Sequence, residues 1–272
     1  MKSSIKNAIE KIADILPFGR DVFLVVMKKR LGISYRGKFD NFQQAQFAIP
    51  DTATKEYDVI NKKKAANEAQ ELERLDNWFH DIDYPLLFWL SKLVTPKIHV
   101  LELGGSVGHF FYTSEHYHQY PDDVLWTIAE LPEAAKLGTK IAQHRNEHRL
   151  RFIDSDLIHT SPASQIFITA GTLQYMNISL PELLRNLPDL PAHVLIHNLP
   201  CHSNEAFWTL QDLGICEVPY YIYSAQTLEN AMSQLGYSVK AEWKNPRFVE
   251  IPFHRHLMID GYLGFYFQRN TA

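Results

Sequence analysis

From residue 97 onward, short runs of β-type residues alternate with helical stretches, and this alternation constrains the fold more than any other feature of the chain. The runs fall at 98–103, 124–129, 150–153, 165–170, 193–197, 237–243 and 261–268. Strands separated by helices are typical of a doubly wound, Rossmann-like α/β sheet. No helix separates the last two runs, so we expect seven strands with an antiparallel pair at one end.

The first 95 residues lack this alternation and are predicted to be mostly helical. Apolar spacing indicates helices over 1–16, 21–31, 62–80 and 84–93, with an irregular stretch near 35–42. We therefore expect an N-terminal helical cap on the substrate side (residues 1–95) and a Rossmann-like domain (residues 96–272). In that domain Ser179 and Ser224 are expected to cap helices. Ligands bind such sheets at the carboxyl ends of the strands.

The composition is that of a globular protein. The chain has 272 residues, of which 46% are hydrophobic and 21% are charged, enough for a sizeable core. Its two cysteines, Cys201 and Cys216, are too few for a disulfide scaffold. The strongest apolar run near the start, residues 22–27, is far shorter than the roughly 20 residues that cross a bilayer. A cytoplasmic protein is therefore expected.

Charge is distributed unevenly along the chain. The formal net charge is −4, but residues 1–64 carry 13 Lys/Arg against 7 Asp/Glu, so the remainder is acidic. Such a basic arm can contact an anionic surface, including the inner membrane, or it can be a solvated helical surface. The charge density is too low for a nucleic-acid-binding protein, so we expect no nucleic-acid partner. Nothing in the pattern indicates an oligomeric state.

A glycine-rich loop follows the strand expected at 98–103 and opens a helix. Glycines let the backbone approach a ligand closely, and a helix N-terminus offers unpaired N–H groups. The dinucleotide pattern G-x-G-x-x-G fails, because Ser106 and His109 occupy two of its glycine positions. The methyltransferase pattern acidic-x-G-x-G-x-G fits, with one serine in place of a glycine. The loop residues expected to hold a cofactor are Glu102, Gly104, Gly105, Ser106 and Gly108.

Carboxylates follow the next two strands. Glu130 and Leu131 end the second strand, 28 residues after the acidic position of the loop. An acidic residue there can accept hydrogen bonds from both ribose hydroxyls, although a surface or helix N-terminal carboxylate is the alternative. After the third strand, Asp156 could accept from an adenine amino group while Leu157 packs on the ring. Asp154 could instead simply cap that turn.

The loop after the fourth strand lies where the transferred group of a cofactor would face its acceptor. Gly171 and Thr172 begin this loop, and Tyr175 follows three residues later. We expect the first two to contact the cofactor. Tyr175, together with the tyrosine-rich segment 220–223, could form an aromatic wall near the acceptor, or these rings could simply be half-buried packing residues.

Several segments resemble a little-characterised family of bacterial S-adenosylmethionine-dependent methyltransferases whose genes often accompany surface-polysaccharide genes. The similarity extends from about residue 35 to the C-terminus, and Leu173-Gln174-Tyr175 is its most family-specific piece. The segments are Tyr35-Arg36-Gly37, Tyr57-Asp58, residues 101–108, residues 126–132, residues 172–176 and residues 261–265. The resemblance implies a class I methyltransferase fold and polysaccharide biosynthesis. Glutamate at 102 and serine at 106 depart from the more usual aspartate and glycine.

The chain offers several groups that could assist methyl transfer from the sulfonium of S-adenosylmethionine, whose product is S-adenosylhomocysteine. A hydroxyl acceptor benefits from a general base. His197 ends the fifth strand, His254 precedes the last strand, and Tyr175 is the third candidate. With 13 histidines in the chain, one near a strand end is expected by chance. No Cys/His spacing is typical of zinc, so no metal is expected.

The sequence therefore predicts an S-adenosylmethionine-dependent methyltransferase. We expect O-methylation of a small molecule, or of a glycan or glycan precursor because of the resemblance. A non-catalytic binding or assembly module with the same fold is the alternative, since no clear base motif is present. A nicotinamide-dependent oxidoreductase is disfavoured by the failed dinucleotide pattern.

Overall fold

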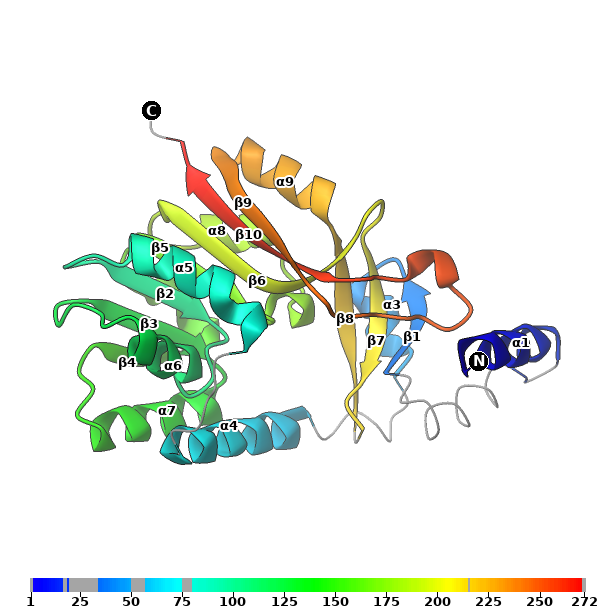
Figure 1. Ribbon diagram of the computed structural model, residues 1–272, viewed down its shortest axis with the longest axis horizontal. Coiled ribbons are helices and arrows are strands. Elements are labelled where there is room, and N and C mark those ends of the chain that lie inside the picture. Colours follow the sequence, from blue (N-terminus) through cyan, green and yellow to red (C-terminus); the bar gives the residue numbers. More distant parts are fainter. Residues whose placement is uncertain are drawn as a thin grey trace.

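A parallel sheet forms the centre of the protein (Figure 1). The computed structural model describes residues 2–16, 19, 34–49, 57–74, 80–214 and 216–270. The central strands lie in the order β4-β3-β2-β5-β6 and are all parallel. Their bounds are β2 His99–Leu103, β3 Leu125–Glu130, β4 Leu150–Asp154, β5 Ile166–Ala170 and β6 His193–His202. Each coincides with a predicted run to within a few residues, except that β6 is longer.

The last two strands complete this sheet. β10 (Tyr262–Arg269) lies between β6 and β9 (Tyr237–Asn245) and is antiparallel to both. The antiparallel pair predicted for the last two strands is therefore confirmed, and it lies beside β6 at one side of the five parallel strands. This arrangement leaves the carboxyl ends of the parallel strands together at one edge, where β2, β3 and β5 lead into the predicted ligand loops.

A second group of strands extends from the end of β6. Cys201 and His202 of β6 pair with β8 (Glu217–Ser224), which continues antiparallel to β7 (Phe207–Asp212) and then to β1 (Tyr35–Phe39). The sheet therefore has ten strands rather than seven, and the irregular stretch expected near 35–42 is a strand followed by a helix. Arg36 of β1 pairs with Leu210 of β7, and a local sequence pattern cannot predict a pairing between residues so far apart in the chain.

Helices cover both faces of the central sheet. On one face, α5 (Tyr84–Leu93) and α6 (His109–Tyr117) pack with Trp126 of β3 in one buried cluster. On the other, α8 (Leu180–Arg185) and α9 (Ala225–Gln234) pack with Phe265 and Phe267 of β10. Ser179 and Ser224 accept the capping hydrogen bonds of these last two helices, as predicted. α7 (Pro132–His144) lies along β4.

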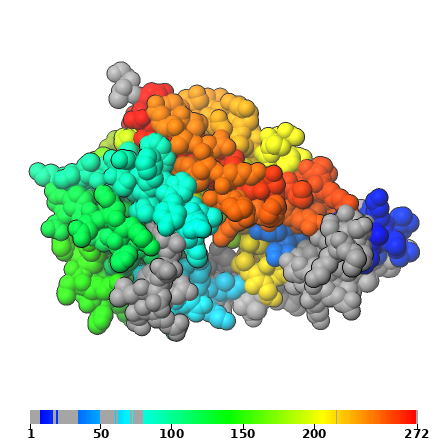
Figure 2. All heavy atoms as spheres, viewed as in Figure 1, coloured from blue at the N-terminus to red at the C-terminus, as the bar shows by residue number. Residues whose placement is uncertain are grey.

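The described elements before residue 95 contact different parts of the molecule. α1 (Lys2–Ile15) lies at one end of the molecule (Figure 2), where Glu10 pairs with Arg255 at 3.0 Å. α3 (Phe42–Phe47) follows β1, and α4 (Tyr57–Arg74) packs on α7 and α6 through Ala65 and Leu72. The helix predicted at 21–31 lies outside the described residues. The division at residue 95 and the membrane contact of the basic arm stay predictions.

No helix in the described part of the chain is both long and apolar enough to span a bilayer.

Candidate functional site

The glycine loop between β2 and α6 has a backbone conformation that residues with a Cβ atom rarely adopt. Gly104 has φ +78°, and a Cβ atom there would lie 1.9 Å from the Oγ1 atom of Thr172. Gly108 has φ +90° and forms the N-cap of α6. Both conformations lie in the left-handed region that favours glycine. The close approach of Gly104 to Thr172 brings the first and fourth predicted loops into contact.

Ser106 adopts the left-handed conformation that a glycine would occupy in the usual loop. Its φ is +51°, which strains any residue with a Cβ atom. The backbone N–H of Ser106 donates to Oε2 of Glu130 at 2.8 Å. Residue 106 is therefore kept in place by a contact with the second predicted loop, which offsets the missing glycine.

Glu130 connects two backbone segments at the carboxyl end of β3. Its Oε2 accepts from Ser106, and its Oε1 accepts from the N–H of Leu131 at 2.7 Å. Each carboxylate oxygen has two lone pairs, so each keeps one acceptor position after these bonds. The carboxylate is therefore oriented by the protein and still able to receive two further hydrogen bonds.

Glu102 lies beneath the glycine loop rather than on its surface. It is 2% exposed, its Oε2 accepts from Nε1 of Trp126 at 2.8 Å, and a Cβ atom at Gly105 would lie 2.6 Å from its Cδ atom. Burial raises the pKa of Glu102 to about 7, with the Trp126 bond opposing this rise and Glu130 and Glu68 adding to it. Glu102 therefore supports the loop from below.

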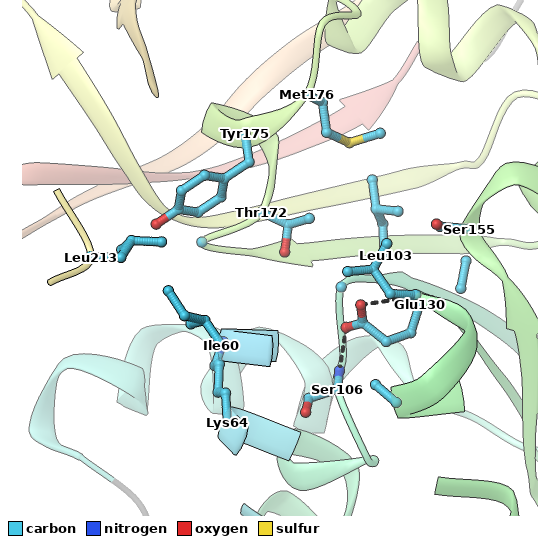
Figure 3. Close-up of a pocket in the computed structure, with 15 residues that line it drawn as sticks. Ile60, Lys64, Leu103, Ser106, Glu130, Ser155, Thr172, Tyr175, Met176 and Leu213 are labelled. Carbon is cyan, nitrogen blue, oxygen red and sulfur yellow. Dashed lines mark hydrogen bonds between the residues drawn. The ribbon is translucent and has the colours of Figure 1, made fainter. Parts of the chain in front are cut away.

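A cavity of about 300 Å³ opens above these loops (Figure 3). Six of the predicted cofactor residues line it, as does the predicted Tyr175. The predicted members are Gly104, Ser106, Glu130, Leu131, Gly171 and Thr172. The sequence did not indicate Ile60, Lys64, Leu103, Ala129, Ala134, Ser155, Met176 or Leu213, which also line it. Ile60 and Lys64 share one face of α4 because they are four residues apart, but this spacing does not say which element the face contacts.

The two ends of the cavity differ in chemistry. Figure 3 shows Glu130, Ser106 and Ser155 at one end, where the dashed lines mark the two hydrogen bonds of the carboxylate. Ile60, Tyr175 and Leu213 lie at the other. One end can therefore recognise hydroxyl groups through a carboxylate, whereas the other presents mainly apolar side chains.

A network of hydroxyl and amide groups fixes Tyr175. Its Oη donates to Oε1 of Gln211 at 2.8 Å, and Nε2 of Gln211 donates to Oη of Tyr35 at 3.1 Å. The hydroxyl of Tyr262 lies 3.2 Å from that of Tyr35 and 2.8 Å from that of Tyr220. Burial is the largest cause that raises the pKa of the three phenols Tyr35, Tyr220 and Tyr262, so all three are neutral at physiological pH.

Five predicted cofactor residues do not line the cavity. Gly105 and Gly108 are part of the glycine loop, and Glu102 packs beneath it against Gly105. Asp156 and Leu157 are exposed and directly follow Ser155, which does line it. Asp154 accepts from the N–H of Asp156 at 3.0 Å, so the capping role weighed for Asp154 is the one the structure shows.

The two candidate histidines also lie away from the cavity. His197 is 1% exposed. Its Nδ1 accepts a hydrogen bond from Nε1 of Trp243 at 2.9 Å. The ring proton of His197 is therefore on Nε2, which donates to Oδ1 of Asp83 at 2.9 Å. Both nitrogens are thus used in bonds that join β6, β9 and the start of α5. His254 lies in the loop after β9, where its ring contacts His256. Neither imidazole is placed to act on a ligand in the cavity.

Metal ligands are not assembled in the part of the chain that the structure describes, since no three His, Cys, Asp or Glu side chains there are grouped to hold an ion. Cys201 and Cys216 are both buried.

Known structures share this architecture, although no family model and no curated protein matches the sequence. The Burkholderia thailandensis 1,6-didemethyltoxoflavin-N1-methyltransferase, solved with bound 1,6-didemethyltoxoflavin and S-adenosylhomocysteine, is 15% identical with a TM-score of 0.50, covering 82% of this chain and 92% of that chain. An S-adenosylmethionine-dependent methyltransferase from Clostridium acetobutylicum is 9% identical, with a TM-score of 0.50 and coverages of 77% and 99%.

A third structure shows that this fold is not confined to methyl transfer. The [4+2]-cyclase SpnF is 12% identical with a TM-score of 0.52, covering 88% of this chain and 100% of that chain. At such identities the comparisons establish architecture, and chemistry must be argued from the site. The protein has the Rossmann-like fold of class I methyltransferases.

Proposed function

We propose that the protein is an S-adenosylmethionine-dependent methyltransferase. The observation that carries this proposal is the placement of Glu130, which is oriented by two backbone N–H groups at the strand end and keeps two acceptor positions. These positions suit the two vicinal hydroxyls of a ribose. Gly104 supports it, because the loop has no room for a side chain where the backbone meets Thr172.

The residues around Glu130 suit the rest of an adenosine. Ala129, Leu131 and Ala134 offer an apolar slot next to the carboxylate, and Ser155 adds a hydroxyl. Lys64 lines the same cavity from α4 and can attract the carboxylate of the donor's amino-acid portion. When bound, the donor would supply an electrophilic methyl carbon: an electron pair of the acceptor would form the new bond, the sulfur would keep the pair of the broken carbon–sulfur bond, and a hydroxyl acceptor would lose its proton to solvent.

The chain's own task is then to orient the acceptor and to keep water out. Tyr175 and Leu213 lie at the end of the cavity away from Glu130, so we place the acceptor there. We propose that it is a small molecule methylated on oxygen. A glycan precursor, which the family resemblance implies, belongs in the same acceptor panel.

Calorimetry with S-adenosylmethionine, S-adenosylhomocysteine and NAD tests the proposal. We expect the first two to bind and NAD not to bind. Glu130→Ala should lower the affinity for S-adenosylhomocysteine by roughly 1–3 kcal/mol, because a charged acceptor is lost. Glu133→Ala, which removes a 55% exposed carboxylate three residues away, should leave it unchanged. Equal affinities of the two variants would remove Glu130 from the site.

A module that binds the donor without transferring its methyl group is the second candidate. The cavity lining supports keeping it, because it includes neither His197 nor His254, the two histidine candidates for a general base. Release of S-adenosylhomocysteine in the presence of an acceptor panel distinguishes the two. Donor binding without turnover on any member of the panel favours the module.

A further inference from the structure

The end of the cavity away from Glu130 is formed by three segments that are distant in sequence. Ile60 comes from α4, Tyr175 from the turn after β5, and Leu213 from the connection between β7 and β8. Figure 3 shows their side chains gathered on the side opposite Glu130, with Met176 and Thr172 between the two ends. A ligand portion placed there contacts two aliphatic side chains and one aromatic ring.

The polar atom that Tyr175 brings to this end has a defined hydrogen-bonding direction. The amide of Gln211 is oriented by its Nε2–H···Oη bond to Tyr35, so its Oε1 faces Tyr175 and receives the phenol proton at 2.8 Å. Because that proton is committed to Gln211, the Tyr175 oxygen can act toward a ligand only as an acceptor. The ring is also held edge-to-face against Tyr220, with centroids 5.2 Å apart.

These features discriminate between classes of acceptor. A polyhydroxylated ring placed among Ile60, Leu213 and Tyr175 would remove several hydroxyl donors from water, and a buried donor without a partner is costly. A flat apolar ring gains from the same burial. A single hydroxyl or N–H on that ring matches the acceptor oxygen of Tyr175.

We infer that the acceptor is a planar, largely apolar molecule with one hydroxyl group, phenol-like in character, rather than a sugar. This inference rests on the proposed function for its reaction, and it narrows the acceptor within the proposed class. Gln211 and Tyr35 are then positioning residues, which act through Tyr175 and do not touch the acceptor.

Binding to the protein saturated with S-adenosylhomocysteine tests this inference. The probes are 2-naphthol, 2-methoxynaphthalene, which has the same rings without the donor, and methyl α-D-glucopyranoside. We expect 2-naphthol to bind most tightly and the glucoside not to bind. Tyr175→Phe should remove the preference for 2-naphthol over 2-methoxynaphthalene. Gln211→Leu should weaken this preference, since Tyr175 then loses the partner that holds its proton.

Two matched substitutions show where the probes bind. Leu213→Asp should lower the affinity for both naphthalenes at least about tenfold, because it places a charge in the apolar end. Phe248→Asp changes a 69% exposed side chain away from the cavity and should have no effect. Tighter binding of the glucoside than of 2-naphthol, or naphthol binding that is unchanged in Leu213→Asp, overturns the inference.

The same experiment separates this inference from the proposed function. If S-adenosylhomocysteine does not bind the wild-type protein, the proposed function fails, and the probes titrated into the unliganded protein still decide the character of the apolar end. If S-adenosylhomocysteine binds but the probe order is reversed, the inference alone fails.

Discussion

The two ends of the cavity were assembled in different ways. The end around Glu130 consists of loops that directly follow buried parallel strands, and the loops contact one another through Ser106–Glu130 and Gly104–Thr172. The opposite end combines Tyr175, which follows β5, with residues of α4 and of the β7–β8 connection, and these last two belong to elements added around the central sheet. Under the proposed function, the loops that follow the parallel strands hold most of the donor, and the added elements supply Lys64 and part of the acceptor end.

The largest expected effect tests the rigidity of the first end. Gly104→Ala should abolish binding of S-adenosylhomocysteine, because its Cβ atom would overlap Oγ1 of Thr172. Gly236→Ala is the control, since Gly236 has a similar φ of +87° but open space around it. Calorimetry on both variants, with circular dichroism to check folding, separates overlap from backbone strain. Retained binding in Gly104→Ala would show that the loop does not adopt this conformation.

The next effect concerns the carboxyl beneath the loop. Because the pKa of Glu102 is raised to about 7 in the folded protein, the folded state holds a proton that the unfolded state releases, and the free energy of unfolding falls as pH rises from about 4.5 to 7. Glu102→Gln should remove this fall. The free energy of unfolding of the variant should therefore rise relative to that of wild type by up to about 3 kcal/mol between pH 4.5 and 8.

Urea denaturation of both proteins across that pH range measures the difference. Glu133→Gln, at an exposed carboxyl, should follow the wild-type curve. A constant difference between Glu102→Gln and wild type at every pH would show that Glu102 titrates normally.

A smaller effect tests the contribution of α4 to donor binding. Lys64 is 67% exposed, so its attraction for a carboxylate is limited by solvent. Lys64→Ala should weaken S-adenosylhomocysteine binding by about fivefold, near 1 kcal/mol, and leave binding of 5′-methylthioadenosine, which lacks the amino-acid portion, unchanged. Lys63→Ala, an exposed neighbour, should affect neither ligand. An equal loss of affinity for both ligands would mean that Lys64 does not contact the amino-acid portion and instead affects the shape of the cavity.

The last effect, of similar size, concerns the serine that departs from the usual glycine pattern. Ser106→Gly should raise the free energy of unfolding by about 1 kcal/mol, because glycine adopts the φ of +51° without the Cβ penalty. Ser106→Ala keeps the Cβ atom and should show no such gain. Thermal unfolding of the two variants compares strain with loss of the hydroxyl. A gain in both would assign the effect to the hydroxyl rather than to the backbone.

Much of the first end could be predicted because its signals are local. A buried apolar run followed by glycines and a carboxylate indicates a strand, a turn and a ligand contact within a few residues. Gly104 and Glu130 were found in this way, and so were the caps at Ser179 and Ser224. Asp156 and Leu157 do not line the cavity, whereas the adjacent Ser155 does, because a strand end presents several neighbouring residues and the turn geometry selects among them; their contact with a cofactor stays a prediction.

The surroundings of His197, the candidate base, could not be predicted from local patterns. His197 was expected near the ligand because it ends a strand. Its side chain instead points to the face covered by α5, where Asp83 and Trp243 use both nitrogens. These partners are 114 and 46 residues away, so no spacing in the sequence could have indicated them.

The sequence alone determined the alternating strands and helices, the antiparallel pair at one edge and the glycine loop with its following carboxylate, because each depends on hydrophobic period, turn chemistry and caps within one segment. Only the tertiary structure decided that β1 joins β7, that Ile60 and Lys64 of α4 face the cavity, and that Tyr175 is held by Gln211. Those contacts connect segments whose separation along the chain carries no periodic signal, and packing of the whole molecule selects them.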